Sequence, residues 1–494
     1  MQAATCRSKS VRHAWQEPAQ QDKEPCPMRI IRRQPLEGRH HLILLAGAIG
    51  ILLYGIIALG TPTAIALITA GAFAIALCLL WGIGWQRIEN DLLAGIHAML
   101  VPILILISVG MMVGVWMLSG TIPAMVAIGL EALSPALFLV VACLSCSMMS
   151  IMAGTSWGTL STIGVALMGV AIGLDIPPAY AAGAIVTGTF FGDKLSPLSD
   201  TTVMASAVCG VNIITHIKHM LYTTLPAYGL ALVIYAWLGS VAATSGGISG
   251  DTQEILQALH TNFELTPVTL LPPLVVFACI LLRQPVLPSF FLGILSGALL
   301  AMLVQGASLS AVGEALNTGY TADSGIPMVD DMLSRGGLQG MMSTVAVLIA
   351  AAVLGAPFKS AGTLDAAVQM LARRHAGRRQ VLGGAMALHG TAFLLTGSYY
   401  VTFSLLGPLL RPLVTASGSD PKNLSRILED TGTTLSPLVP WGVTGAFTAA
   451  TLGVATADFF IYAILCYATI LFSLFYVISG LAQGRPIAAS DASS

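Results

Sequence analysis

Residues 191–202 read Phe-Gly-Asp-Lys-Leu-Ser-Pro-Leu-Ser-Asp-Thr-Thr, and the tetrapeptide Leu-Ser-Pro-Leu within this stretch occurs again at 435–438. The second copy lies in Glu-Asp-Thr-Gly-Thr-Thr-Leu-Ser-Pro-Leu-Val-Pro over residues 429–440. Pro197 and Pro437 each remove a helical N–H and clash with the preceding turn. We therefore expect a helix to break at each copy.

The rest of the sequence is dominated by residues that are compatible with lipid. Hydrophobic residues make up 55% of the 494 residues and charged residues only 9%, against about 25% in soluble domains. Runs without a charged residue cover 42–84, 92–130, 132–174, 220–250, 284–313, 380–410, 431–457 and 459–484. A membrane-spanning helix needs about 20 apolar residues, so several runs hold more than one span. We predict an all-α polytopic membrane protein with about 12 or 13 transmembrane segments.

The spans fall into two predicted halves, residues 41–243 and 265–482, which are joined by a polar connection over 244–264. Residues 1–40 are polar and basic and lack the apolar core of a signal peptide. The positive-inside rule places this segment in the cytoplasm, and Met28 offers an alternative start that would remove residues 1–27. Residues 483–494 are predicted to form a C-terminal tail.

A second pair of similar segments precedes the two breaks. Gly154-Thr-Ser-Trp157 lies 41 residues before Leu195, and Gly397-Ser-Tyr-Tyr400 lies 38 residues before Leu435. Within a bilayer, interrupted backbone is tolerated only where protein or a water-filled cavity covers it. Matched helix breaks in two halves of a membrane chain are typical of secondary transporters, which bind their substrates between two repeats. We predict two related repeats with broken helices or re-entrant hairpins.

Charged residues are rare beside the two breaks and are therefore informative. A charge at the bilayer centre costs at least about 2.5–3.5 kcal/mol on insertion scales, so such a residue normally pairs or binds something. Asp193 and Lys194 are adjacent and are expected to neutralise each other. Asp200 has no basic neighbour and is followed by two threonines. Because a small hard cation prefers oxygen ligands and a desolvated carboxylate readily takes up a proton, we predict that Asp200 binds Na⁺ or H⁺ in competition.

The predicted ion site takes carboxylate and hydroxyl groups from both breaks: Asp193, Ser196, Ser199, Asp200, Thr201 and Thr202 from the first, and Thr433, Thr434 and Ser436 from the second. The predicted supporting residues are Lys194, Pro197, Pro437, Glu429 and Asp430, with Gly154, Thr155, Ser156 and Gly192 permitting close approach of the backbone. Asp200 is the Na⁺ candidate. No cofactor is expected, and the expected partners are the lipid bilayer and small inorganic cations, with no nucleic acid.

Several of these assignments compete with a structural interpretation. Glu429 and Asp430 follow Lys422 and Arg426, so helix capping near a polar loop is an equal alternative for them. His216 and His219 have the i, i+3 spacing that can hold a metal. No cysteine or acidic residue is near them in sequence, which favours an interfacial cluster at the start of a span. Cys143 and Cys146 have the spacing of a redox motif. Because they lie in an apolar run, the sequence favours a helix-packing face of small residues over a redox site.

The sequence contains no Gly-rich phosphate-binding loop and no nucleophile motif in a strand–turn–helix context. We therefore expect no enzymatic activity. An intramembrane enzyme and a passive channel are the rival hypotheses from other functional classes.

Several segments resemble the NhaC family of Na⁺/H⁺ antiporters: 154–159, 191–202, 216–226, 421–441 and 450–453. The resemblance runs from residue 40 to residue 480. It implies a secondary transporter of the bacterial inner membrane that works by alternating access, in a superfamily with paired re-entrant hairpins and frequent homodimers. Some relatives exchange malate for lactate. The alternative is therefore a cation-coupled exchanger of small carboxylates, with Lys194 as the anchor for the anion.

The chain departs from the family pattern at three places. Val203-Met-Ala-Ser206 replaces an Asn-Leu-Ala-Pro stretch, and Gly442-Val-Thr444 replaces Asn-Thr-Cys. Gly397-Ser-Tyr-Tyr400 stands where relatives often have a Ser-Glu-Gln-Tyr type of stretch, so an expected carboxylate is missing. The resemblance thus implies an ion site with fewer polar ligands than in those relatives.

Overall fold

The computed structural model describes residues 36–245, 250–325, 329–330, 333–373 and 377–481. Most of the predicted N-terminal segment and all of the predicted C-terminal tail lie outside these residues. Residues from Glu37 onward form one compact unit, and its described part is helical without any strand. The all-α prediction is confirmed.

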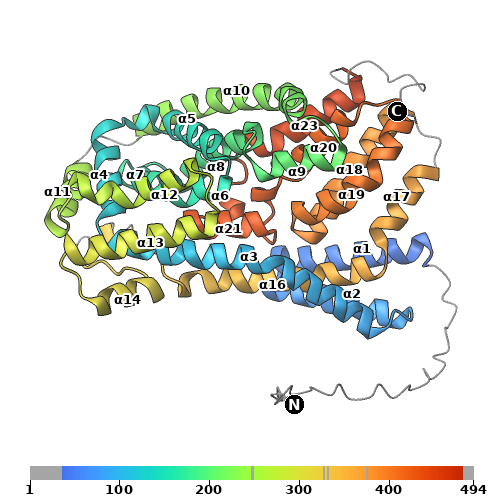
Figure 1. Cartoon of the computed structure of the whole chain (residues 1–494), viewed down its shortest axis with the longest axis horizontal. Helices are drawn as coiled ribbons and strands as arrows, with labels where there is room; N and C mark the ends of the chain where they lie inside the picture. The colour runs from blue at the N-terminus through green and yellow to red at the C-terminus, as the bar shows by residue number, and fades with distance from the viewer. Residues whose placement is uncertain (1–35, 246–249, 326–328, 331–332, 374–376, 482–494) are drawn as a thin grey trace, which may run out of the picture. The chain divides into compact units, whose positions relative to one another are not determined.

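The helices of the first half follow the predicted spans closely (Figure 1). They are α1 (Gly38–Leu53), α2 (Thr63–Leu80), α3 (Trp85–Leu118), α4 (Thr121–Ala132), α5 (Pro135–Ala153), α6 (Ser156–Thr159), α7 (Val165–Gly173), α8 (Pro178–Leu195), α9 (Asp200–Cys209) and α10 (Ile213–Ser245). A π-helical segment, Leu160–Gly164, joins α6 to α7.

Much of the predicted polar connection over 244–264 forms a helix, α11 (Gly250–Asn262). The helices of the second half are α12 (Leu271–Leu281), α13 (Val286–Leu303), α14 (Leu309–Asn317), α16 (Met342–Ser360), α17 (Thr363–Arg373), α18 (Arg378–Thr396), α19 (Tyr399–Ala416), α20 (Pro421–Thr431), α21 (Val443–Leu452), α22 (Thr456–Phe459) and α23 (Ile464–Ser479).

Both copies of Leu-Ser-Pro-Leu interrupt a helix, as predicted. Helix α8 ends at Leu195, and Ser196 has extended backbone with φ −78° and ψ 126°. A residue that precedes proline is driven out of the helical region, which explains this end. The second copy follows α20 and forms a single 3₁₀ turn, Ser436–Leu438, before the chain re-enters a helix at Val443.

Eight helical stretches in the described residues are long and apolar enough to cross a membrane, or nine if the bent α11–α12 pair counts as one span. This number is lower than the predicted total of about 12 or 13 spans. Some predicted spans fall short in length, since α23 has only 16 residues and α12 only 11. Others, such as α8, end in charged residues. The repeat organisation stays a prediction.

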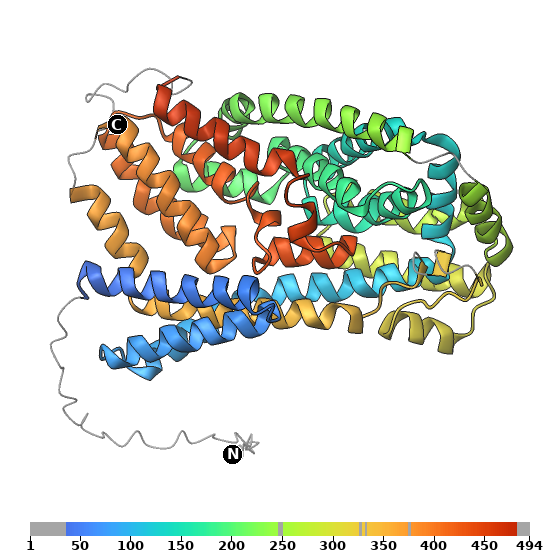
Figure 2. The ribbon, with the colours of Figure 1, turned by 180° about the vertical axis from the view of Figure 1, so that it is seen from behind.

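The packing of the helices produces two hydrophobic cores. The larger core joins α3, α5, α8, α10 and α13, and the smaller one joins α9, α18, α19 and α20. Helix α16 packs along α2 and α3, and Figures 1 and 2 show α3 and α16 running side by side.

Helices α5 and α8 approach each other closely because glycine lines their contact. A Cβ atom on Gly188 would lie 2.1 Å from the carbonyl oxygen of Cys143, and one on Gly192 would lie 2.5 Å from that of Ser147. Cys143 and Cys146 are buried free thiols on this face. Small residues at helix contacts are the usual basis of close packing in membranes.

Candidate functional site

Four of the helix interruptions contribute to one cavity of about 290 Å³. Its polar lining comes from the α5–α6 break (Thr155, Ser156), the start of α9 (Asp200), the α18–α19 break (Ser398, Tyr399, Tyr400) and the start of α21 (Thr444). Its apolar lining includes Ala98, Val101, Pro102 and Ile105 from α3. The cavity is therefore a polar centre that is closed on one side by a hydrophobic helix.

The two Gly-containing breaks have matching local geometry. Gly154 ends α5 with φ +65°, and Gly397 ends α18 with φ +63°. In each case the next residue is extended, with φ −150° at Thr155 and −137° at Ser398, and a helix follows at once. A positive φ is adopted at little cost only by glycine. The sequence similarity between 154–157 and 397–400 is thus matched by similar backbone at the cavity wall.

Asp200 is the acidic residue of the cavity and is exposed to it. As the first residue of α9, it accepts a hydrogen bond from the backbone N–H of Thr201 at 3.0 Å. The hydroxyl of Tyr400 donates to its second carboxylate oxygen, which joins α19 to α9. A carboxylate at the N-terminus of a helix is stabilised by the helix dipole.

Asp193 lies behind the cavity and is 1% exposed. The hydroxyls of Ser156 and Ser199 approach its carboxylate, and its charge interacts with that of Asp200. One of its carboxylate oxygens has no hydrogen-bond partner among the described residues. Two acidic groups are therefore within electrostatic range of each other, one in the cavity and one buried.

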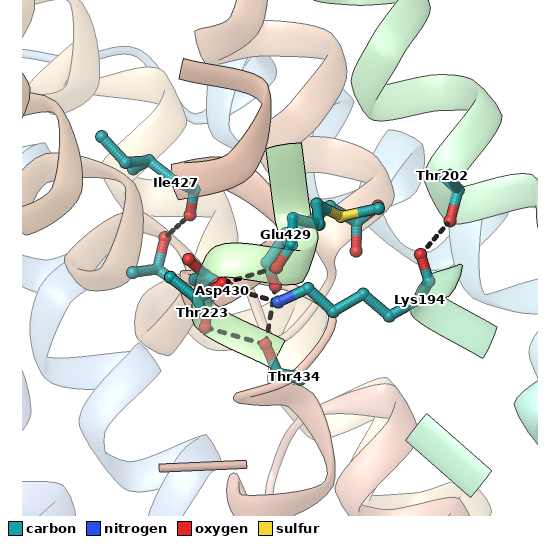
Figure 3. A network of polar contacts seen from close by, with 9 residues as sticks. Lys194, Thr202, Thr223, Ile427, Glu429, Asp430 and Thr434 are labelled. Atoms are coloured by element: carbon teal, nitrogen blue, oxygen red, sulfur yellow. Dashed lines mark hydrogen bonds and ion pairs between the residues drawn. The ribbon is translucent and has the colours of Figure 1, made fainter. Parts of the chain in front are cut away.

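Lys194 and Asp430 form a salt bridge in which both side chains are fully buried (Figure 3). Lys194 comes from the end of α8 and Asp430 from the end of α20, and the Thr223 hydroxyl of α10 donates to Asp430 at 3.2 Å. The prediction that Asp193 and Lys194 neutralise each other is wrong. Successive residues of a helix point about 100° apart, so Lys194 faces α20 while Asp193 faces the cavity side.

Glu429, like Asp430, is fully buried, which contradicts the alternative interpretation that the two residues cap a helix near a polar loop. Its carboxylate interacts with the charges of Lys194, Asp193 and Asp430. The Thr433 hydroxyl is nearby, but neither group makes a hydrogen bond within the described residues. Arg426, which suggested the loop, is itself buried and lies over the ring of Tyr476.

Most of the predicted hydroxyl ligands are buried and bond to the backbone of the breaks. Thr202 donates to the carbonyl of Lys194 at 3.1 Å, and Thr434 donates to that of Glu429 at 2.9 Å. Ser196 donates to Ile151, Ser436 donates to Thr433, and Ser199 bonds with Thr201. The hydroxyls of Ser196, Thr202, Thr434 and Ser436 thus satisfy backbone carbonyls near the helix ends, and none of these predicted ligands lines the cavity.

His216 and His219 lie in the first turns of α10, at the start of a predicted span, and both are buried within the protein. His216 bonds with Ser425 at 2.8 Å and His219 with Asn423 at 3.1 Å, both on α20. No group of three metal-ligating side chains is found among the described residues. The histidines hold α10 against α20.

Sequence reasoning missed several residues of the cavity: Ser398, Tyr399, Tyr400, Thr444 and Trp157. The similarity between 397–400 and 154–157 is a usable signal in the sequence. It predicts a repeat, and both segments line the cavity.

Comparison with known proteins gives consistent matches. The profile of the Na⁺/H⁺ antiporter family matches residues 39–207 and 188–481. The Na⁺/H⁺ antiporter NhaC of Alkalihalophilus pseudofirmus is 36% identical, over 86% of this chain and 91% of that protein. NhaC of Bacillus subtilis is 34% identical, over 81% of this chain and 88% of that protein. The malate-2H⁺/Na⁺-lactate antiporter of Bacillus subtilis is 31% identical, over 89% of this chain and 94% of that protein.

Proposed function

This chain belongs to the Na⁺/H⁺ antiporter family, and on that premise we propose that it exchanges Na⁺ for H⁺ at the cavity of Asp200 by alternating access. One observation carries the proposal: an acidic side chain in a cavity that is otherwise lined by hydroxyl groups and apolar residues. The carboxylate binds either a proton or Na⁺ and never both, so that each ion displaces the other.

The surroundings of Asp200 suit both states of the carboxylate. Tyr400 and the N–H of Thr201 donate hydrogen bonds to it, and such donors stabilise the negative charge that Na⁺ requires. Hydroxyl oxygens of Thr155, Ser156, Ser398 and Thr444 lie around the same cavity. These are hard oxygen ligands of the kind that small cations prefer.

Asp193 acts in this proposal as a second, buried acidic group. Its interaction with Asp200 makes it unfavourable for both carboxylates to be charged at once. Binding of a cation at Asp200 therefore favours the charged form of Asp193, and loss of the cation favours its protonation. The two acids together couple occupancy of the cavity to proton uptake.

The alternative substrate class is less well supported. A small carboxylate needs a cationic anchor, and Lys194 was the candidate for that role. Lys194 is fully buried in its pair with Asp430 and does not line the cavity. Among the described residues that line the cavity, none is Lys or Arg. An anion would meet Asp200 there without a compensating charge.

The location follows the same premise. The relatives come from bacteria, and we place this chain in the bacterial inner membrane with a cytoplasmic N-terminus. The support for this orientation is the basic character of residues 1–40 together with the basic loop around Arg378 and Arg379. We also propose that the protein forms a homodimer, and this part of the proposal rests only on the resemblance to the family.

Exchange by the reconstituted protein tests the proposal. In proteoliposomes with an imposed Na⁺ gradient, we expect wild type to generate a pH difference and Asp200→Asn to generate none. Asp175→Asn is the matched control, because Asp175 is an exposed loop residue with φ +55°, a backbone that Asn also adopts. Undiminished exchange by Asp200→Asn would rule out this assignment.

A further inference from the structure

The cavity of Asp200 is the first of three neighbouring cavities along α3 and α16 that share lining residues. A second cavity of about 120 Å³ shares Ala98 and Val401 with it. A third, of about 610 Å³, shares Asp91, Lys359 and Leu405 with the second. The three cavities therefore form a row from Asp200 to Asp91 at the start of α3.

Polar side chains occur at both ends of this row, and most of the residues that line its middle are apolar. The outer cavity is lined by Gln86, Arg87, Asn90, Asp91, Lys359 and Asp365. The middle cavity is lined by small residues on both helices, with Ala94, Gly95 and Ala98 on α3 and Ala352, Gly355 and Ala356 on α16. Polar side chains at both ends suit a passage for ions, because an ion must leave water at one end and meet ligands at the other.

We infer that this row of cavities is the aqueous path by which Na⁺ and H⁺ reach Asp200 from the membrane face at which Asp91 lies. The inference rests on the proposed function of Asp200. Ala98 and Val401 line both of the first two cavities, so we place the apolar constriction of the path at these residues. Hydrophobic constrictions control ion passage because water leaves them readily.

The acidic and basic side chains of the outer cavity balance each other. We therefore expect cations to be selected at the inner end of the row, at Asp200. Asp91 is bonded by Lys359 at 3.1 Å and by the Ser360 hydroxyl at 2.7 Å. Arg87 and Asp365 add one further charge of each sign to the same cavity. The outer cavity therefore admits ions without a strong preference for cations. The carboxylate of Asp200 provides the preference for cations.

Cysteine accessibility tests the path. Ala98→Cys and Gly355→Cys place a thiol at the constriction and in the middle cavity, and a Cβ atom on Gly355 would have only one neighbour within 4 Å, at 3.9 Å. Leu104→Cys is the control, since Leu104 is 47% exposed on α3 but lines none of these three cavities. The described native cysteines are buried and serve as internal references.

Reconstituted variants are treated with a positively charged, membrane-impermeant methanethiosulfonate, and each site is read by peptide mass spectrometry. We expect both path thiols to react at least about tenfold faster than the thiol of Leu104→Cys, because only a hydrated thiol forms the reactive thiolate. Modification of Ala98→Cys should also reduce Na⁺-driven exchange. Reaction no faster than the control, or full modification without loss of exchange, would overturn the inference.

Labelling does not require transport, so the test is independent of the proposed function. The same labelling in the Asp200→Asn background should be fast if the path exists, whatever that variant does to exchange. Fast labelling with undiminished exchange by Asp200→Asn would reject the role of Asp200 and keep the path. Slow labelling with abolished exchange would reject the path and keep Asp200.

Discussion

At the scale of single residues, the contact between Tyr400 and Asp200 links α19 to α9 at the edge of the cavity. A donor stabilises the charged form of its partner carboxylate, so Tyr400 adjusts the competition between Na⁺ and H⁺ without supplying a charge of its own.

Tyr400→Phe removes this donor and leaves the ring in place. A hydrogen bond to a charged group contributes about 1.5–3 kcal/mol, so we expect the half-saturating Na⁺ concentration at neutral pH to rise by roughly tenfold or more. The proton is then harder to displace, and the rise of exchange activity with pH should move to higher pH. Both effects are measured by Na⁺-dependent fluorescence of a pH dye in proteoliposomes.

The matched control for this prediction is Tyr54→Phe, because Tyr54 is 63% exposed and lies outside the cavity. Equal Na⁺ dependence in Tyr400→Phe and Tyr54→Phe would show that the hydroxyl has no part in ion binding.

At the scale of helices, the Lys194–Asp430 pair ties the end of α8 to the end of α20. These ends are the two predicted helix breaks, one from each half of the chain. Breaking a buried pair by removing one partner costs about 3–5 kcal/mol, because the remaining charge is left without compensation. The pair therefore fixes the two breaks relative to each other.

Asp430→Asn should lower the thermal unfolding temperature strongly, since it leaves Lys194 charged and unpaired. Glu429→Gln is an unusually close control, because Glu429 is adjacent, equally buried and without a salt bridge to Lys194. We expect this variant to unfold near the wild-type temperature. Thermal unfolding monitored by fluorescence-detected gel filtration measures both, and equal losses in the two variants would contradict the structural role of the pair.

Gly192→Ala tests the close packing of α5 and α8. The added Cβ would lie 2.5 Å from the carbonyl oxygen of Ser147, and the two helices must separate to admit it. We expect a clear loss of thermal stability, of about 1–3 kcal/mol for an overpacked contact. Gly229→Ala is the control within α10, where a Cβ meets nothing within 4 Å. If Gly192→Ala is as thermally stable as Gly229→Ala, this account of the packing is contradicted.

At the scale of the whole molecule, the helix breaks and most helix positions were predictable from sequence because their causes are local. Pro197 acts on its own neighbours, and α8 ends before it at Leu195, whereas α20 ends at Thr431 and Pro437 lies in the separate 3₁₀ turn that follows. Long apolar runs likewise locate helices without knowledge of the fold. The number of spans was harder to predict from the sequence. Some predicted spans are occupied by short helices such as α12, and others by helices that end in charged residues, such as α8.

The pairing of charges was not predictable, because it depends on how distant segments pack. Lys194 and Asp430 are separated by 236 positions, and adjacency in sequence suggested Asp193 as the partner instead. Lys422 and Arg426 suggested a polar loop at Glu429, but α20 is surrounded by α9, α10, α18, α19 and α23. Because these five helices bury α20, the polar side chains of α20 contact other protein groups and not solvent.

Na⁺ should stabilise the folded protein as a whole, because any ligand that binds only the folded state raises its stability by mass action. At 100 times its dissociation constant, the gain is about 2.7 kcal/mol. The increase in unfolding temperature should be larger at high pH, where protons compete less, and it should be absent in Asp200→Asn. Choline chloride at equal concentration is the control for ionic strength, and equal stabilisation by both salts would contradict a specific Na⁺ site.

The central claim is that one carboxylate, Asp200, binds Na⁺ and H⁺ in competition. Proton release on Na⁺ binding tests it most directly, measured on the purified protein by calorimetry in buffers of different ionisation enthalpy. By linkage, wild type should release about one proton for each Na⁺ bound at a pH where the site is protonated, and Asp200→Asn should neither bind Na⁺ nor release protons. Na⁺ binding without proton release, or an unchanged release in Asp200→Asn, would contradict the account.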